Sequence, residues 1–178
     1  MSNKASNIKI AISGKSGCGN STVSRLTAEK MGLRLINYTF HNMADEMGME
    51  FHELCKKAEK DKTYDITLDK KQIEMAEQGN CVLGSRLAIW LLENADLKVY
   101  LHASPEVRAQ RIQEREGGTY EDVLERTLER DKRDRQRYMN LYDIDNNKYQ
   151  FADLVIDTEK MAPEAISDLI AAEVEKKN

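Results

Sequence analysis

The stretch that decides the fold is IKIAISGKSGCGNST, residues 8–22, in which an apolar run gives way to glycines and then to a Ser-Thr pair. The apolar run predicts a buried strand, and the pair stands where a helical pattern begins. The glycines between them are Gly14, Gly17 and Gly19. They let the backbone turn tightly, so that successive N–H groups and the helix dipole converge on one anion. We expect that anion to be a nucleotide polyphosphate.

The spacing G-x-x-x-x-G-x-S of this stretch matches a phosphate loop, with Ser21 where a hydroxyl meets magnesium. The position that normally holds lysine is Asn20, which carries no charge for the β- and γ-phosphates. Lys15 or arginines from elsewhere would supply that charge, and our hypothesis gives Lys15 part of the role. The competing interpretation is that the glycines merely shape a strand-to-helix turn. The residues expected to bind ATP are Gly14, Lys15, Ser16, Gly17, Cys18, Gly19, Asn20, Ser21 and Thr22.

Composition limits the choices. The chain has 178 residues, of which 40% are hydrophobic and 33% charged, which fits a single domain, residues 1–178. A net charge of −4 argues against a nucleic-acid binder, whose affinity comes from excess Lys and Arg. The cysteines are odd in number and widely spaced, which predicts free thiols in a reducing compartment. They are Cys18, Cys55 and Cys81. No run resembles a membrane span or a signal peptide, so a cytoplasmic protein is expected.

Further along the chain, short apolar runs alternate with helical patterns. We expect strands at Leu33–Ile36, Cys81–Leu83, Leu97–Leu101 and Asp153–Asp157. Short helices are predicted over residues 40–60, a longer one over Asp65–Gln78, and a last one opened by Pro163. Ser104 and Pro105 open another helix, with the hydroxyl as its cap. This alternation predicts an α/β fold with a parallel sheet covered on both faces.

The segment TLERDKRDRQRYMNLYDID, residues 127–145, is the second informative stretch. At about 100° per residue, four arginines fall in one narrow arc with Asp134 beside them: Arg126, Arg130, Arg133 and Arg137. Like charges at this spacing repel, and the planar guanidinium suits phosphate, so the stripe favours phosphate contact. The alternative is a solvated face paired with Glu125, Glu129 and Asp131. The preceding helix repeats the pattern with Arg108, Arg111 and Arg115.

An arginine-bearing segment that can hinge at Gly117-Gly118 fits an enzyme that excludes water while it moves a phosphoryl group. The order GxxGxGxST, VLGSRLAIW, YLHASPEVRAQRIQERE and ERDKRDRQRYMNLYDID resembles the short, archaeal-type cytidylate kinases over nearly the whole chain. The arginine-rich run followed by Y-x-x-x-Y-x-I-D is the more specific part of this resemblance.

The resemblance implies transfer of the γ-phosphoryl group of ATP to CMP or dCMP with Mg²⁺, and it implies a monomer. It implies an adenylate-kinase-like three-layer α/β/α phosphate-loop fold with a five-stranded parallel sheet. Within that fold, a helical insert at about 38–64 would bind the nucleoside monophosphate (NMP), and an arginine-rich lid would cover about 108–137. Arg86 would meet the monophosphate, Arg111 and Arg130 would clamp the transferring phosphoryl group, and Ser21 would hold the metal. Arg137 would hold the acceptor phosphate, and Asp134 the sugar hydroxyls or the arginine geometry.

The sequence departs from the family pattern at three points. Asn20 replaces the loop lysine; His41 stands where an acceptor-phosphate arginine is expected; and Gly84-Ser85 precede Arg86 where many relatives carry an acid. A neutral His41 would bind the phosphate more weakly than arginine. These departures keep two alternatives open: a kinase of another small molecule, and a nucleotide-binding protein that has lost catalysis. RNA binding through the arginine face is disfavoured by the net charge and the interleaved acids.

Overall fold

The computed structural model describes residues 7–177 and is built around a five-stranded sheet in the order β2-β3-β1-β4-β5. Every pairing between neighbouring strands is parallel. The strands are β1 (Lys9–Gly14), β2 (Arg34–Ile36), β3 (Cys81–Gly84), β4 (Leu97–His102) and β5 (Leu154–Asp157). All the predicted strands are therefore confirmed, with ends that differ by a residue or two. Because the strands are parallel, their carboxyl ends share one edge of the sheet, where ligands of such sheets bind.

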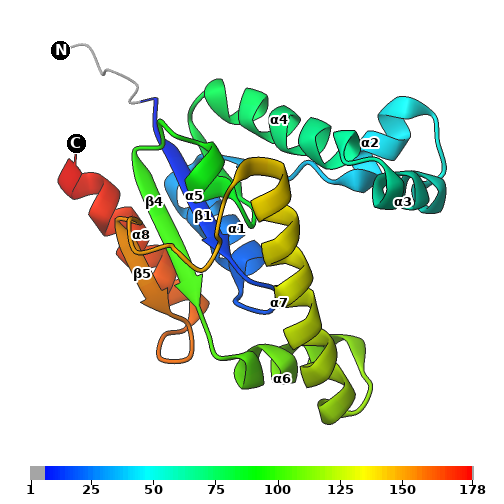
Figure 1. The fold of residues 1–178 in the computed structure, drawn as a ribbon. Coiled ribbons are helices and arrows are strands. Elements are labelled where there is room, and N and C mark those ends of the chain that lie inside the picture. The colour runs from blue at the N-terminus through cyan, green and yellow to red at the C-terminus, as the bar shows by residue number, and fades with distance from the viewer. Residues whose placement is uncertain (1–6, 178) are drawn as a thin grey trace.

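The helices follow the predicted alternation with the strands (Figure 1). They are α1 (Asn20–Met31), α2 (Phe40–Met47), α3 (Phe51–Lys60), α4 (Thr63–Glu77), α5 (Ala88–Leu91), α6 (Pro105–Glu116), α7 (Tyr120–Tyr142) and α8 (Pro163–Lys177). Ser104 caps α6, since its hydroxyl accepts a hydrogen bond from the Val107 N–H at 3.4 Å. Two glycines with positive φ, Gly117 and Gly118, separate α6 from α7.

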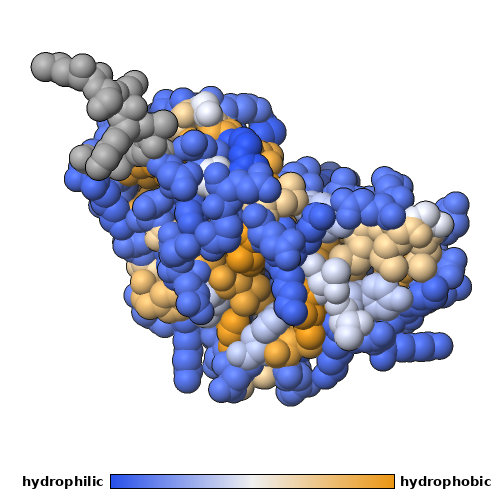
Figure 2. Space-filling model, turned by 90° about the horizontal axis from the view of Figure 1, so that it is seen from above, coloured by the Kyte–Doolittle hydropathy of each residue, from blue (hydrophilic) through white to orange (hydrophobic). Residues whose placement is uncertain are grey.

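Alternation along β1 divides the core between the two faces of the sheet. Ile10 and Ile12 pack with α1 and α8 on one face, whereas Ala11 packs with residues of α4 and α5 on the other. All three are fully buried, as expected for a central strand of a parallel sheet. The three-layer α/β/α arrangement is thus confirmed. Hydrophilic residues form most of the face seen in Figure 2, and hydrophobic residues show mainly in its middle.

Two groups of helices project from this sheet and have small clusters of their own. Tyr38, Met43 and Leu54 hold α2 and α3 together, and Ala109 and Val123 hold α6 against α7. These groups coincide with the segments predicted as NMP-binding insert and lid, whose roles stay predictions. Within residues 7–177, no helix is both long and apolar enough to cross a membrane.

Candidate active site

The loop after β1 has the geometry of an anion cradle. Gly17 has φ 83° and Gly19 has φ 90°, and α1 begins directly afterwards at Asn20. A Cβ on Gly17 would lie 2.8 Å from the Arg108 carbonyl oxygen, so this position requires glycine for space as well as for conformation. The turn aims the start of α1, whose first N–H groups have no partner within the helix, at the carboxyl edge of the sheet.

A cavity of about 590 Å³ opens over this loop and is called here the phosphate cavity. It is lined by Gly14, Lys15, Ser16, Gly17, Gly19, Asn20, Ser21 and Thr22 of the loop, and by Gly84, Ser85, Arg86, Arg111, Arg115, Glu116 and Arg130 from elsewhere. The structure therefore brings together all the predicted ATP-binding residues except Cys18. Lys15 and the arginines make the lining strongly cationic, as polyphosphate binding requires.

Cys18 faces away from the phosphate cavity. Its side chain is 2% exposed and lines a separate cavity of about 290 Å³, together with Tyr100 and Tyr149. Burial raises the pKa of its thiol, against the smaller opposing effect of Arg108. The sequence placed Cys18 among phosphate ligands because every loop residue was included. In the structure its side chain joins the core cluster that contains Ile12 and Leu101.

The Asn20 side chain forms hydrogen bonds with other residues of the protein. Its amide Nδ2 donates to the Ile12 carbonyl at 3.1 Å and to the Ser85 carbonyl at 3.4 Å. Its Oδ1 accepts the Ser24 hydroxyl proton at 2.9 Å. The residue in the usual lysine position thus ties β1 to the end of β3 instead of reaching into the loop.

Arg108 is buried against the phosphate loop and holds it by hydrogen bonds. It is 1% exposed, donates to the Ser16 carbonyl at 3.1 Å, and forms a two-pronged pair with Asp131 of α7, closest at 2.6 Å. Lys15 Nζ lies 3.7 Å from the same carboxylate. The expectation that Arg108 repeats the phosphate-binding stripe is therefore wrong for this residue, which is buried beneath the loop.

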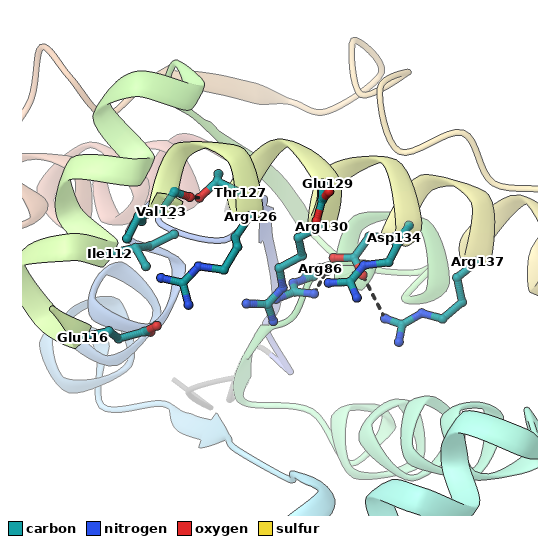
Figure 3. Close-up of a pocket in the computed structure, with 11 residues that line it drawn as sticks. Arg86, Ile112, Glu116, Val123, Arg126, Thr127, Glu129, Arg130, Asp134 and Arg137 are labelled. Carbon is teal, nitrogen blue, oxygen red and sulfur yellow. Dashed lines mark hydrogen bonds and ion pairs between the residues drawn. The ribbon is translucent and has the colours of Figure 1, made fainter. Parts of the chain in front are cut away.

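The arginine stripe of α7 lines a second cavity of about 580 Å³, called here the arginine cavity. Figure 3 shows Arg126, Arg130 and Arg137 descending from α7 toward the same space as Arg86. The remaining lining residues are Ile112, Glu116, Val123, Thr127, Glu129, Arg133 and Asp134. The predicted common arc is confirmed, since all four arginines of the stripe line one cavity. Among residues 7–177, Arg126, Arg130 and Arg133 form no ion pair, so the alternative pairing with Glu125, Glu129 and Asp131 is absent. Asp131 pairs instead with Arg108 and Lys15.

Two arginines connect this stripe to the loop. Arg130 donates to the Ser16 hydroxyl at 3.3 Å, and Arg111 donates to the Gly17 carbonyl at 3.3 Å and to Thr158. Burial, and then the neighbouring positive charge of Arg86, lower the pKa of Arg130. The guanidinium nevertheless stays protonated at neutral pH. An anion between these groups would relieve their repulsion.

Asp134 organises the other arginines. It pairs with Arg86 at 2.5 Å and with Arg137 at 3.5 Å, and Arg137 also lies 3.5 Å from Asp65 of α4. The arrangement alternates in charge from the end of β3 across α7 to α4, so each arginine has a fixed position. Asp134 thus contacts two arginines, and both roles that the resemblance implied for it stay predictions.

Another cavity, of about 300 Å³, lies between α4 and α7 and is called here the acceptor cavity. Its lining residues are Phe40, Asp65, Leu68, Asp69, Gln72, Ser85, Arg86, Leu87, Arg130, Arg137, Tyr138 and Leu141. Arg86 and Arg130 line three of these cavities, the phosphate, arginine and acceptor cavities, so they stand where the phosphate and acceptor cavities meet. Asp69 accepts the Tyr142 hydroxyl proton at 2.6 Å, and burial raises its pKa.

His41 is not brought to these cavities. It is exposed on α2 and stacks on Phe51, with ring centroids 3.6 Å apart and planes at 11°. Its contact with an acceptor phosphate stays a prediction that this conformation does not support.

Sequence reasoning missed the acidic side of the acceptor cavity and the buried pair below the loop. Asp65 and Asp69 stand four residues apart on α4, a helical spacing that places both on one face. That spacing could have found them. Nothing in the sequence separates Arg108 from Arg111, because both belong to the same charged helix and only packing against the loop buries one of them.

Comparison with known proteins agrees with this geometry. Residues 9–160 match the model of the cytidylate kinase-like family. The chain is 47% identical over 175 residues to cytidylate kinase 2 of Borrelia garinii subsp. bavariensis, covering 96% of this chain and 98% of that one. It is 40% identical over 168 residues to the cytidylate kinase of Pyrococcus horikoshii, covering 93% and 88%.

Solved structures show the same fold at much lower sequence identity. Shikimate kinase from Bacteroides thetaiotaomicron superposes with a TM-score of 0.67 at 14% identity, covering 94% of this chain and 98% of that one. Deoxyadenosine kinase from M. mycoides, solved with bound dATP, superposes with a TM-score of 0.58 at 22% identity, covering 94% of this chain and 100% of that one. These likenesses establish a phosphate-loop kinase fold, and the family match and the curated relatives carry the assignment further: the chain belongs to the cytidylate kinase-like family.

Proposed function

We propose that this protein transfers the γ-phosphoryl group of ATP to CMP or dCMP, producing CDP or dCDP and ADP. The observation that carries the proposal is the junction of the phosphate and acceptor cavities at Arg86 and Arg130. A donor bound at the loop and an acceptor bound between α4 and α7 would present their phosphates to the same two guanidinium groups. Family membership supports the chemistry and the acceptor class.

In this proposal the loop holds the ATP phosphates through its backbone N–H groups, as its glycine geometry favours. An oxygen of the acceptor phosphate attacks the γ-phosphorus, and the bond from that phosphorus to the bridging oxygen of ADP breaks. Charge spreads over the transferring group, so positioned cations supply most of the catalysis and no protein nucleophile is needed. Arg111 and Arg130 hold this group from the donor side, and Arg137 holds the acceptor phosphate. Arg86, which lines both cavities, contacts the phosphates of donor and acceptor.

Mg²⁺ fits the residues present, because it commonly keeps several waters and takes few protein ligands beside substrate phosphates. Residues 7–177 contain no group of three or more His, Cys, Asp or Glu side chains that could hold a metal. Ser21, which lines the phosphate cavity, would offer its hydroxyl. When bound, the ion would neutralise charge on the β- and γ-phosphates.

The acceptor cavity suits cytosine better than uracil. Its polar wall on α4 carries the carboxylates of Asp65 and Asp69, and Gln72, whose amide N–H donates to the Tyr38 carbonyl at 2.9 Å, leaves an oxygen as acceptor. Acceptors of this kind complement the exocyclic amine of cytosine, whereas the O4 of uracil would face them without a proton to share. Leu68, Leu87 and Leu141 supply apolar walls for the base.

An acceptor screen tests the proposal. ADP release from MgATP would be followed by a coupled assay with CMP, dCMP, UMP, AMP, shikimate or no acceptor. We expect rapid turnover with CMP or dCMP, at least about tenfold slower turnover with UMP from the loss of one hydrogen bond to a charged group, and little with the others.

Each other outcome of the screen points to a named alternative. Equal rates with all nucleotides would remove the base preference, and turnover with a different acceptor would make the protein a kinase of another small molecule. Tight ATP binding without turnover on any acceptor would identify a nucleotide-binding protein without catalysis.

A further inference from the structure

The general phosphate-loop pattern has lysine where this chain has Asn20, and the structure indicates what this residue does instead. Its three hydrogen bonds all lead away from the loop, to Ile12 of β1, to Ser85 after β3 and to Ser24 of α1. Both amide protons and the amide oxygen are therefore engaged. No polar atom of the Asn20 side chain is left to bind phosphate in this arrangement.

Both backbone polar groups of Ser85 are hydrogen-bonded. Its N–H donates to the Ile12 carbonyl at 3.1 Å, and its own carbonyl accepts from Asn20 at 3.4 Å. The Ile12 carbonyl accepts from Ser85 and from Asn20 together, so the three residues form one closed set of bonds. The residue that follows Ser85 is Arg86, one of the two arginines common to all three cavities.

Gly84 belongs to the same arrangement. A Cβ at this position would clash with the Ser24 hydroxyl and would lie 2.8 Å from Asn20 Oδ1. The space that a side chain at residue 84 would occupy is thus filled by the Asn20–Ser24 pair. Two of the departures from the family pattern, at Asn20 and at Gly84-Ser85, are therefore parts of one local structure.

We propose that Asn20 is a positioning residue that fixes the Ser85 carbonyl and, through it, the segment that carries Arg86, so that Arg86 supplies the cationic charge that a loop lysine supplies elsewhere. The inference rests on the proposed function, since it assigns Arg86 to the reacting phosphates. Asp134 fixes the other end of Arg86 at 2.5 Å, so its backbone and its guanidinium are both held. A lysine side chain at position 20 would have no oxygen to accept the Ser24 hydrogen bond. It would also lack the planar amide NH₂ group that donates to the Ile12 and Ser85 carbonyls.

The test begins with Asn20→Lys, for which the two interpretations predict opposite signs. If Asn20 is only a weakened lysine, this variant restores the motif, and both kcat and ATP affinity rise. If Asn20 positions Arg86, kcat falls by about tenfold to a hundredfold, the cost of a misplaced catalytic group. The matched control is Ser24→Ala, which removes a hydrogen bond from the same cluster without touching Ser85, and it should keep nearly wild-type kcat.

A double-mutant cycle between Asn20→Ala and Arg86→Ala identifies the route of the effect. The quantity compared in the cycle is MgATP affinity, measured by calorimetry. This affinity can be measured without an acceptor, so the cycle is informative even if CMP proves not to be the acceptor. We expect Asn20→Ala to weaken binding clearly in the wild-type background and hardly at all once Arg86 is gone. Equal losses in both backgrounds would overturn the proposal.

Thermal unfolding of each variant separates positioning from loss of the fold. Should Asn20→Ala fail to fold, Asn20→Thr, which keeps one hydroxyl donor for a carbonyl, replaces it in the cycle. A wild-type protein that binds MgATP but phosphorylates no cytidine monophosphate would remove the proposed function and leave this cycle interpretable.

Discussion

Three close Arg–Asp pairs involve helix α7, and their surroundings differ. Arg108–Asp131 closes at 2.6 Å with the arginine side chain 2% exposed, whereas Arg86–Asp134 closes at 2.5 Å with 29% exposed. Arg135–Asp145, at the end of the same helix, closes at 2.8 Å with 52% exposed. The first pair lies under the phosphate loop, the second faces the three cavities, and the third faces solvent.

The comparison separates three roles for the same pair of residue types. A buried pair is costly to break, because removing one partner leaves an unpaired charge away from water. A pair beside a cavity presents a guanidinium that a ligand can share, and an exposed pair contributes little. Asp131 and Asp134 stand three residues apart on α7, yet the first pairs with a buried arginine and the second lines the arginine cavity.

The largest effect is expected at the cavity pair. Arg86→Ala should lower kcat/KM for CMP about a thousandfold, as removal of an arginine that stabilises a transferring phosphoryl group does. Its thermal unfolding should stay close to that of the wild type, because the side chain borders cavities. Steady-state kinetics and calorimetry check both parts. A variant with normal kinetics would place Arg86 outside the reaction.

The next effect concerns the buried pair, and it should appear in stability. Arg108→Met removes the guanidinium that holds the Ser16 carbonyl and Asp131, and should lower the free energy of unfolding by about 3 kcal/mol. For a chain of this size, that corresponds to a fall in Tm of roughly 6–12 °C. Denaturant titration measures it. An unchanged midpoint would mean that Arg108 is no part of the scaffold, and the contrast with Arg86 would fail.

Lys15 belongs both to the phosphate cavity, which it lines, and to the surroundings of the buried Arg108–Asp131 pair, because its Nζ lies 3.7 Å from Asp131. Lys15→Ala should weaken MgATP binding about tenfold, the value of one charged contact to phosphate. Lys15→Arg, which keeps the charge, is the matched control. If ATP affinity and turnover were the same with alanine, the loop would draw its charge from the arginines alone.

The smallest effect is a pH dependence at the exposed pair. Arg135, and then the Asn147 N–H, lower the pKa of Asp145 to about 2, below an ordinary value of about 3.9. A lowered pKa stabilises the fold above the unfolded-state value, and this contribution is lost as pH falls from about 4 to 2.

Comparing Asp145→Asn with the wild type tests this expectation. The Tm difference should be small at pH 6, since the pair is exposed, and should vanish near pH 2. A difference that grows on acidification would contradict the assignment.

Much of the fold was predictable because local patterns and tertiary structure agree. The apolar run before Gly14 became β1, and the Gly117-Gly118 break did separate two helices. The common arc of the α7 arginines was predictable as well, because helical periodicity alone determines which side chains share a face.

The orientation of individual polar side chains was not predictable in the same way. Arg108 and Cys18 are buried by packing between elements far apart in sequence, and Asn20 finds its partners on β1 and just after β3. Motif spacing reports where a residue stands along the chain, and it cannot report which of several neighbours a side chain will meet. For that reason the loop was correctly located, while the role of Asn20 at the usual lysine position was open.

The most direct measurement of the central claim follows the phosphoryl group itself. The protein would be incubated with Mg²⁺, CMP and ATP labelled with ³²P at the γ-position, and the nucleotides would be separated, with Arg86→Ala in parallel. The account predicts that label moves into CDP with the wild-type protein and stays in ATP with the variant. Label that remains in ATP with the wild type, or that reaches CDP equally fast without Arg86, would contradict it.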